Sequence, residues 1–201
     1  MSTASEPYVT PEQYLALERR AETKSEYVNG RVYALAGASR AHILITGNVA
    51  RSLGNQLRGR PCETYVSDMR VKVSPTGLYT YPDVVALCEP PQLEDAYVDT
   101  LLNPAVIVEV LSESTERYDR GEKFAHYRRL PSLREYVLVA KDRARVEHYA
   151  RQGEQWVLTE LADLDASCAL PTIGCALALR DVYERVDVAP NGSPTGRPEG
   201  R

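Results

Sequence analysis

The sequence predicts an α/β (mixed α+β) fold in which a central mixed sheet is flanked by helices. Two stretches carry apolar residues at helical spacing, a dense β-branched run suits a central strand, and three strand-like runs follow one another in the second half. With 201 residues, of which 43% are hydrophobic, the chain can bury one sizeable core. We therefore expect a single domain over residues 1–188.

The first predicted elements are a helix and a hairpin. In TPEQYLALERRAE, Thr10 is a candidate N-cap and Pro11 suits the first helical position. SEYVNGRVYALAG then places Asn29 and Gly30 between two short runs with β character. Because both central residues of a type I′ turn need positive φ, this dipeptide predicts a two-residue hairpin turn.

A long helix and the central strands come next. Between Arg40 and about Arg58, one helical face collects the apolar residues Ile43, Leu44, Val49, Leu53 and Leu57. The segments CETYVSDMRVKV (62–73) and LYTYPDVVALC (78–88) alternate or run apolar as strands do. NPAVIVEVLS (103–112) is the run densest in β-branched residues, which is typical of the centre of a sheet.

The second half predicts one more helix and an antiparallel meander. STERYDRGEKFAHYRRL (114–130) has the pattern of a helix that ends before Pro131. REYVLVA, RVEHYA and QWVLTEL follow as strands. From position 190 to 200, Pro or Gly stands at every second residue, so neither a helix nor a sheet can continue. We expect residues 189–201 to form a disordered tail.

Charge limits the classes of partner. A formal charge of −4 and a pI near 5.5 are not those of a polybasic nucleic-acid binder, so any such surface must be local. Residues 40–60 hold four arginines and no acid, and residues 115–134 hold six basic residues against three acids. Both stretches suit a phosphate backbone, although solvated helix faces use arginine in the same way.

The ends of the chain and its cysteines bear on location. The N-terminus MSTASEPYVT lacks a basic and apolar leader, and no later stretch is apolar enough to span a bilayer. We expect no membrane partner and a cytoplasmic location. In that reducing compartment the four cysteines, which show no C-x-x-C spacing, are expected to be free thiols and not disulfides or a zinc site.

Two carboxylates stand in predicted strands. Asp83 opens the apolar run PDVVALC, and strand alternation puts Glu109 on one face with Ile107 and Leu111. A buried carboxylate needs a cation or hydrogen-bond donors. If the two strands are neighbours, both acids and the Val110 carbonyl supply the hard oxygen ligands that Mg²⁺ or Mn²⁺ prefers. Taken singly, Asp83 would serve as a turn cap and Glu109 as the partner of an arginine.

The helix after the central strand carries a lysine, Lys123, that suits such a site. A lysine helps to cleave phosphodiesters by stabilising the charge that develops. Leu111 occupies the place, two residues after Glu109, where this lysine is expected. Asp119 and Tyr127 share a helical stripe with Lys123. The alternative is an ordinary solvated helix with an Asp119–Lys123 pair.

Three motifs carry a resemblance to a known family. YPDVVALCEPP, PAVIVEVLSEST and YDRGEKFAHYRR, in this order and spacing, resemble the Uma family of restriction-endonuclease-like proteins in the PD-(D/E)XK nuclease superfamily. The similarity spans roughly residues 10 to 185. It implies a restriction-endonuclease-like fold with Asp83 and Glu109 as metal-binding acids and Lys123 as a relocated lysine. Glu26 matches an acid near the first helix that reaches the metal through water, and His42 matches a family position whose role stays open.

The resulting hypothesis is a magnesium- or manganese-dependent DNA endonuclease. Asp83, Glu109 and Val110 are expected to hold the metal, with Lys123 and Glu26 completing the catalytic set. A homodimer is expected because the hairpin at residues 26–35 and the late meander leave sheet edges that symmetric pairing covers.

Two alternatives to this function stay open. One is a non-catalytic nucleic-acid-binding or interaction protein that retains the nuclease fold. The other is a metal-dependent hydrolase of a different phosphoester. The joint presence of Asp83, Glu109 and Lys123 favours the nuclease over a protein whose activity has lapsed.

Overall fold

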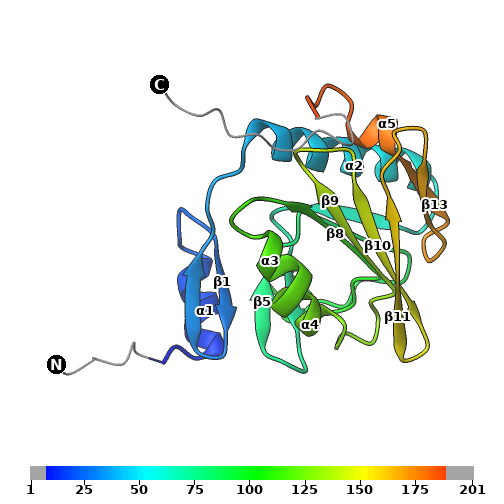
Figure 1. Cartoon of the computed structure of the whole chain (residues 1–201). Helices are drawn as coiled ribbons and strands as arrows, with labels where there is room; N and C mark the ends of the chain where they lie inside the picture. Colours follow the sequence, from blue (N-terminus) through cyan, green and yellow to red (C-terminus); the bar gives the residue numbers. More distant parts are fainter. Residues whose placement is uncertain (1–7, 189–201) are drawn as a thin grey trace, which may run out of the picture.

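Two mixed sheets form the framework of the chain, and a computed structural model describes residues 8–188 of it (Figure 1). The six-stranded sheet has the order β11-β10-β9-β8-β6-β3, the five-stranded sheet has the order β2-β1-β5-β4-β7, and β12 pairs with β13. The strands are β1 (Ser25–Val28), β2 (Arg31–Ala34), β3 (Glu63–Val66), β4 (Arg70–Val73), β5 (Leu78–Thr80), β6 (Val84–Leu87), β7 (Thr100–Leu101), β8 (Val106–Leu111), β9 (Glu135–Ala140), β10 (Val146–Gln152), β11 (Gln155–Leu161), β12 (Ser167–Leu170) and β13 (Cys175–Ala178). The mixed α+β class is confirmed.

The N-terminal helix and hairpin form as predicted. Helix α1 (Pro11–Glu18) starts after Thr10, whose hydroxyl accepts from the Gln13 N–H while the Gln13 side chain accepts from the Thr10 N–H. Asn29 and Gly30 turn β1 into β2 with φ of 47° and 87°. These are the left-handed angles that a type I′ turn requires.

Helix α2 (Arg40–Leu57) lies across one face of the six-stranded sheet, at the top of Figure 1. The buried stripe is Ile45, Val49, Leu53 and Leu57, which belongs to the same core cluster as Val106, Val108 and Val110 of β8. The prediction for Ile43 is wrong, because its side chain is 60% exposed. The stripe that starts at Ile45 turns Ile43 away from the sheet.

The strand segments after α2 each divide between the two large sheets. Residues 62–73 contribute β3 to the six-stranded sheet and β4 to the five-stranded one, and residues 78–88 contribute β5 and β6 in the same way. Pro82 lies at the second division and has no N–H to donate to a ladder, so it ends β5 pairing. This division carries the chain from one sheet to the other next to Asp83.

Strand β8 lies inside the six-stranded sheet, between β6 and β9, as predicted. Ile107 and Leu111 pack into a second core cluster with Tyr127 and Tyr136, on the face opposite to α2. Residues of the five-stranded sheet complete that cluster. Glu109 shares this face by strand alternation, so its carboxylate points towards the helix over residues 116–127.

The predicted helix over residues 114–130 is interrupted. It comprises α3 (Glu116–Tyr118), a π-helical turn (Asp119–Lys123) and α4 (Phe124–Tyr127). The Asp119 carbonyl accepts a hydrogen bond from the Tyr136 hydroxyl at 3.0 Å. A bond from outside the helix thus supports the wider turn, which places Asp119 and Lys123 towards the interior.

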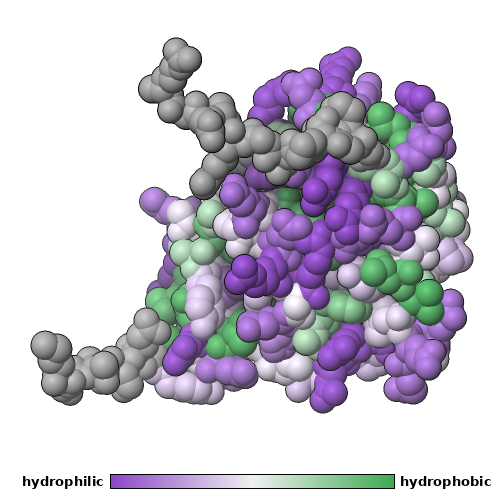
Figure 2. Space-filling view, viewed as in Figure 1, coloured by the Kyte–Doolittle hydropathy of each residue, from purple (hydrophilic) through white to green (hydrophobic). Residues whose placement is uncertain are grey.

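The C-terminal half holds the predicted meander of β9, β10 and β11. The sequence did not reveal β12, β13 and α5 (Leu179–Val182), which pack beside α2. The predicted tail at residues 189–201 lies outside the described residues. Among residues 8–188, no helix is both long and apolar enough to cross a membrane. Figure 2 shows strongly hydrophilic side chains across the middle of one face, over α3.

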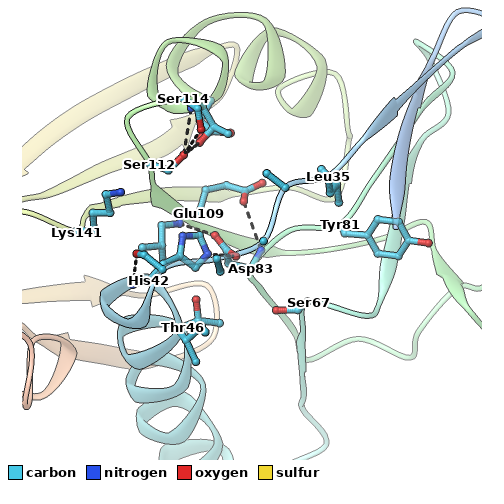
Figure 3. Close-up of a pocket in the computed structure, with 18 of the residues that line it drawn as sticks. Leu35, His42, Thr46, Ser67, Tyr81, Asp83, Glu109, Ser112, Ser114 and Lys141 are labelled. Carbon is cyan, nitrogen blue, oxygen red and sulfur yellow. Dashed lines mark hydrogen bonds and ion pairs between the residues drawn. The ribbon is translucent and has the colours of Figure 1, made fainter. Parts of the chain in front are cut away.

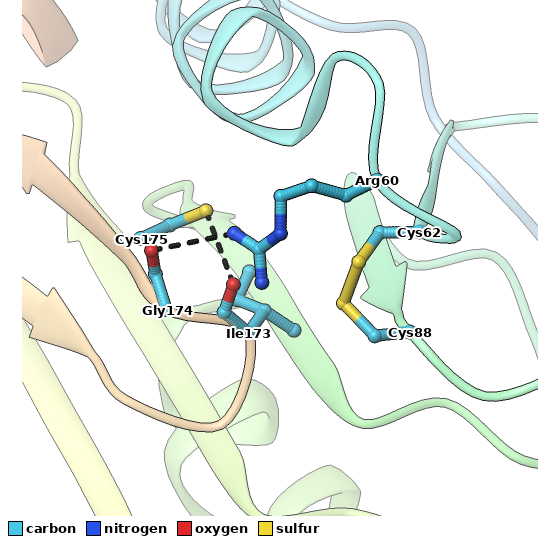
Figure 4. The surroundings of a disulfide bond; sticks show 6 residues. All are labelled: Arg60, Cys62, Cys88, Ile173, Gly174 and Cys175. Carbon is cyan, nitrogen blue, oxygen red and sulfur yellow. Dashed lines mark hydrogen bonds between the residues drawn. A yellow bond between two sulfur atoms is a disulfide. The ribbon is translucent and has the colours of Figure 1, made fainter.

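The prediction of four free thiols is wrong for one pair. Cys62 and Cys88 form a disulfide (Figure 4), whereas Cys168 and Cys175 are free and buried. Cys62 precedes β3 and Cys88 follows β6, and the antiparallel register pairs Glu63 with Leu87. The two cysteines are therefore opposite each other at the next cross-strand position, a relation that their spacing in the sequence does not reveal.

Removal of this disulfide is expected to destabilise the fold. For a loop with a sequence separation of 26, loss of the cross-link lowers the free energy of unfolding by about 3 kcal/mol, because the unfolded chain regains entropy. Urea unfolding with and without dithiothreitol measures the effect. The free energy of unfolding of the variant Cys62→Ser/Cys88→Ser should equal that of the reduced wild type and should not change with dithiothreitol. Equal stability of oxidised and reduced wild type would contradict the prediction.

Candidate active site

A pocket of about 780 Å³ lies where the two large sheets, α2 and the interrupted helix meet. β6 and β8 are antiparallel neighbours, and Val84 pairs with Val108. The start of β6 therefore lies beside the end of β8, and this places Asp83 next to Glu109 and Val110. Figure 3 shows both carboxylates between α2 below and the residues that follow β8 above.

Two donors hold the Asp83 carboxylate. Its Oδ2 accepts the Val110 N–H at 2.7 Å, and its Oδ1 lies 2.7 Å from His42 Nε2. His42 comes from the first turn of α2, where the Ser39 hydroxyl accepts the His42 N–H. The N-cap thus fixes the helix end that aims the imidazole at Asp83.

Glu109 is the deeper of the two acids. Its Oε1 accepts the Tyr127 hydroxyl at 2.8 Å and lies 2.9 Å from Lys123 Nζ, and its Oε2 accepts the Asp83 N–H at 3.4 Å. The side chain of Glu109 is 5% exposed and that of Asp83 is 16% exposed. Asp83 is therefore the acid that a ligand in the pocket reaches more easily.

Lys123 joins three carboxylates from three elements. Its Nζ lies 2.9 Å from Glu109, 3.1 Å from Glu26 of β1 and 3.6 Å from Asp119 of the π-helical turn. The Thr80 hydroxyl donates to Glu26 Oε1, next to the pairing of β1 with β5. Lys123 is 7% exposed, so this cluster is screened from solvent.

The protonation equilibria reflect this burial. Burial, together with the charges of Asp83 and Asp119, raises the pKa of Glu109 to about 8, although Lys123 opposes the shift. Burial also raises the pKa of Asp119. Burial alone would lower the pKa of Lys123, but the carboxylates of Glu109, Glu26 and Asp119 raise it well above its usual value. The ammonium of Lys123 therefore stays charged, whereas Glu109 binds its proton more tightly than a carboxyl group in water does.

The structure brings the predicted site residues together. Glu26, Asp83, Glu109, Val110 and Lys123 all line the pocket. Val110 directs its N–H at Asp83, and its role as a carbonyl ligand stays a prediction. Leu111, which occupies the usual position of the lysine, is buried in the apolar core. Lys123 Nζ lies 2.9 Å from Glu109, and its role as the relocated lysine stays a prediction.

Sequence reasoning missed several contacts of the site. The partner of His42, Asp83, is 41 residues away and was not predicted. The sequence pattern connects Asp119 only with Lys123 on the helix, and it predicts no role for Thr80. The position of Thr80, three residues before Asp83 in the same run, was the available signal.

Some arginines of the local basic stretches are paired with acids of this chain. Arg51 pairs with Glu184, and Arg120 pairs with Glu116 and Glu147. Such paired arginines offer less charge to a phosphate backbone than the count along the sequence implied. A phosphate-binding surface therefore has to be sought residue by residue around the pocket.

Comparisons with known proteins identify a family and two relatives. A sequence model of the Uma2 family, described as "Putative restriction endonuclease", matches residues 11–180. The uncharacterized protein sll1609 of Synechocystis sp. is 40% identical over 162 residues, which cover 80% of this chain and 92% of that protein. A second uncharacterized Synechocystis protein, slr1290, is 35% identical over 178 residues, or 88% of this chain and 92% of its own.

A solved structure shares the fold. It is the crystal structure of a "putative nuclease belonging to DUF820" from Anabaena variabilis, which superposes with a TM-score of 0.72. The match covers 87% of this chain and 97% of that one. At 17% sequence identity, the similarity concerns the fold alone.

Replacement of Lys123 by methionine tests the ion cluster. Three buried carboxylates would lose their cation, so Lys123→Met is expected to lower the free energy of unfolding by about 3–5 kcal/mol at neutral pH. Glu109→Gln in the same chain should recover part of the loss because it removes one carboxylate. Urea unfolding measures both variants. A loss below about 1 kcal/mol would show that the cluster does not depend on Lys123.

The raised pKa of Glu109 predicts a pH dependence of stability. With a pKa of about 8 in the folded state against 4.5 ordinarily, Glu109 binds its proton more tightly when folded. Its contribution is complete below the ordinary pKa and is lost as the pH rises through about 8. Urea unfolding in EDTA should show wild-type stability falling, relative to Glu109→Gln, across this window. A constant difference between the two proteins would exclude the shift.

Proposed function

The chain belongs to the Uma2 family, and from this premise we propose that it is a metal-dependent endonuclease that hydrolyses phosphodiester bonds of DNA. One observation carries the proposal. Asp83, Glu109, Glu26 and Lys123, which come from two sheets and a helix, converge on one pocket. Convergence of acids and a lysine from distant segments is the arrangement that phosphodiester hydrolysis uses.

The donor set suits a hard divalent cation. Asp83 and Glu109 offer carboxylate oxygens. The Val110 N–H points towards Asp83, and the Val110 carbonyl is expected to lie on the same side of the strand. Within residues 8–188, no three His, Cys, Asp or Glu side chains are grouped to hold a metal ion. Mg²⁺ nevertheless takes one or two carboxylates and fills its remaining positions with water and phosphate oxygens. The raised pKa of Glu109 indicates that its ionised form lacks sufficient positive charge nearby, which a bound cation would provide.

Each residue then has a distinct task. When bound, Mg²⁺ or Mn²⁺ supplies an acidified water and neutralises phosphate charge. Asp83 and Glu109 would hold the cation, and His42 with the Val110 N–H keeps the Asp83 carboxylate in one orientation. Lys123 stays charged between Glu109 and Glu26, and this charge would stabilise negative charge that develops on the phosphate.

The assembly and location expected from the sequence belong to the same proposal. A homodimer would present two such pockets to the two strands of a duplex. A cytoplasmic location would place the protein beside DNA. The disulfide between Cys62 and Cys88 would then have to withstand a reducing environment.

Cleavage and metal binding test the function directly. Supercoiled and single-stranded DNA are incubated with the protein and Mg²⁺, Mn²⁺ or EDTA, and nicking is expected only with a metal. Asp83→Asn should lower the cleavage rate at least about 100-fold, since it removes a charged ligand. It should also abolish the rise in melting temperature that Mn²⁺ causes.

A matched variant controls for the loss of one carboxylate. Asp68 lies near the pocket but does not line it, and its side chain is 88% exposed. Asp68→Asn should therefore keep wild-type cleavage and the full effect of Mn²⁺. If the wild type neither nicks DNA nor gains stability from either metal, the nuclease proposal fails and the non-catalytic alternative takes its place.

A further inference from the structure

Lys141 is the lysine of the pocket that the protein leaves unused. The pocket is lined by five carboxylates and by Lys24, Lys123 and Lys141. Lys24 binds the Ser67 carbonyl and the Asp68 carboxylate, both at 2.9 Å, and Lys123 is enclosed by its acids. Within the described residues 8–188, Lys141 makes no hydrogen bond or ion pair. Its ammonium is therefore available to an anion.

The position of Lys141 follows from the parallel pairing of β8 and β9. Ala140, the last residue of β9, pairs with Leu111, and Val139 pairs with Val110. Lys141 is two residues beyond Val139, the partner of Val110. At a rise of about 3.3 Å per residue, it lies about 7 Å further along the strand direction than Val110 does. In Figure 3 it lies on the opposite side of Asp83 from Tyr81.

Neutral donors lie on the same side of the pocket. The hydroxyls of Ser112 and Ser114 are 3.0 Å apart and line the pocket with Lys141. Figure 3 shows both serines above the line from Lys141 to Glu109. Hydroxyls and ammonium groups are the side chains that position a nucleic-acid backbone without reading its bases.

The carboxylates of the pocket are a reason for a free lysine to contact a phosphate there. Five carboxylates repel a phosphodiester chain, and Lys123 is already committed to three of them. A metal ion at Asp83 and Glu109 would serve one phosphate. The neighbouring phosphate of the same strand would lie several ångströms away and would need its own positive partner.

We infer that Lys141 binds the phosphate next to the scissile one in a nucleic-acid strand. The ligand class is the sugar–phosphate backbone, so the contact is independent of base sequence. The inference rests on the proposed nuclease function and adds to it the direction in which the strand leaves the acids, towards the end of β9.

The salt dependence of binding tests this contact. Fluorescence anisotropy follows a 5′-fluorescein-labelled single strand and its duplex, with Ca²⁺ in place of Mg²⁺ and a gel to show that the DNA stays intact. Between about 50 and 200 mM salt, loss of one phosphate contact makes the slope of log K against log salt shallower by about 0.7 for the single strand and 0.9 for the duplex. Lys141→Gln should show this change and bind about fivefold more weakly at about 0.1 M salt.

Two variants separate the contact from a general loss of charge. Lys141→Arg should keep the wild-type slope. Arg143→Gln removes the same charge two residues away, from a side chain that does not line the pocket, and should also leave the slope unchanged. Melting temperatures show that each variant is folded.

Failure of the inference differs from failure of the function. If the wild type binds and cleaves DNA while Lys141→Gln keeps its slope, the contact is wrong and the nuclease stands. The same conclusion follows if Arg143→Gln changes the slope as much as Lys141→Gln does. If the wild type neither binds nor cleaves DNA, both proposals are overturned.

Discussion

The buried ion cluster around Lys123 is the constraint on which the site depends. Glu109 comes from the six-stranded sheet, Glu26 from the five-stranded sheet, and Lys123 from the helix that packs against both. Burying a carboxylate without a partner costs free energy. The Lys123 ammonium offsets part of this cost, and the surrounding carboxylates in turn keep Lys123 charged. The cluster therefore joins three elements at the pocket.

The π-helical turn is what allows the helix to supply this lysine. A regular α-helix has no spare carbonyl in its middle, whereas here the Asp119 carbonyl is bonded by Tyr136 of β9. The wider turn directs both Asp119 and Lys123 inwards, where they are almost completely buried. The turn thereby places the Lys123 ammonium 2.9 Å from Glu109, although Lys123 lies on the element that follows β8.

Asp83 and Glu109, at the neighbouring ends of β6 and β8, have different surroundings. Asp83 lies at the pocket surface with its oxygens facing an imidazole and a backbone N–H, whereas Glu109 lies beneath it against an ammonium and a phenol. Unlike environments are a usual way to divide roles between two carboxylates. Asp83 is the more accessible of the two, whereas Glu109 is in contact with the buried Lys123.

The sequence alone was sufficient where the information is local. The N-cap at Thr10, the turn at Asn29 and Gly30, and the alternation of β8 depend on residues a few positions apart, and all three were predicted correctly. The two acids were also recognisable, because a carboxylate inside an apolar run conflicts with burial at any position in a fold. The helical stripe drew attention to Lys123, whereas its role as a relocated lysine and the choice of Glu26 came from the family resemblance.

Only the tertiary structure decided which distant groups meet. The contact of His42 with Asp83 spans 41 residues, and the disulfide spans 26. The division of residues 62–88 between two sheets depends on which strands pair. Lys141 likewise enters the pocket because β8 and β9 run parallel and end at one edge. Strand pairing and register are collective properties of the folded chain, so hydrophobic periodicity within one segment cannot specify them.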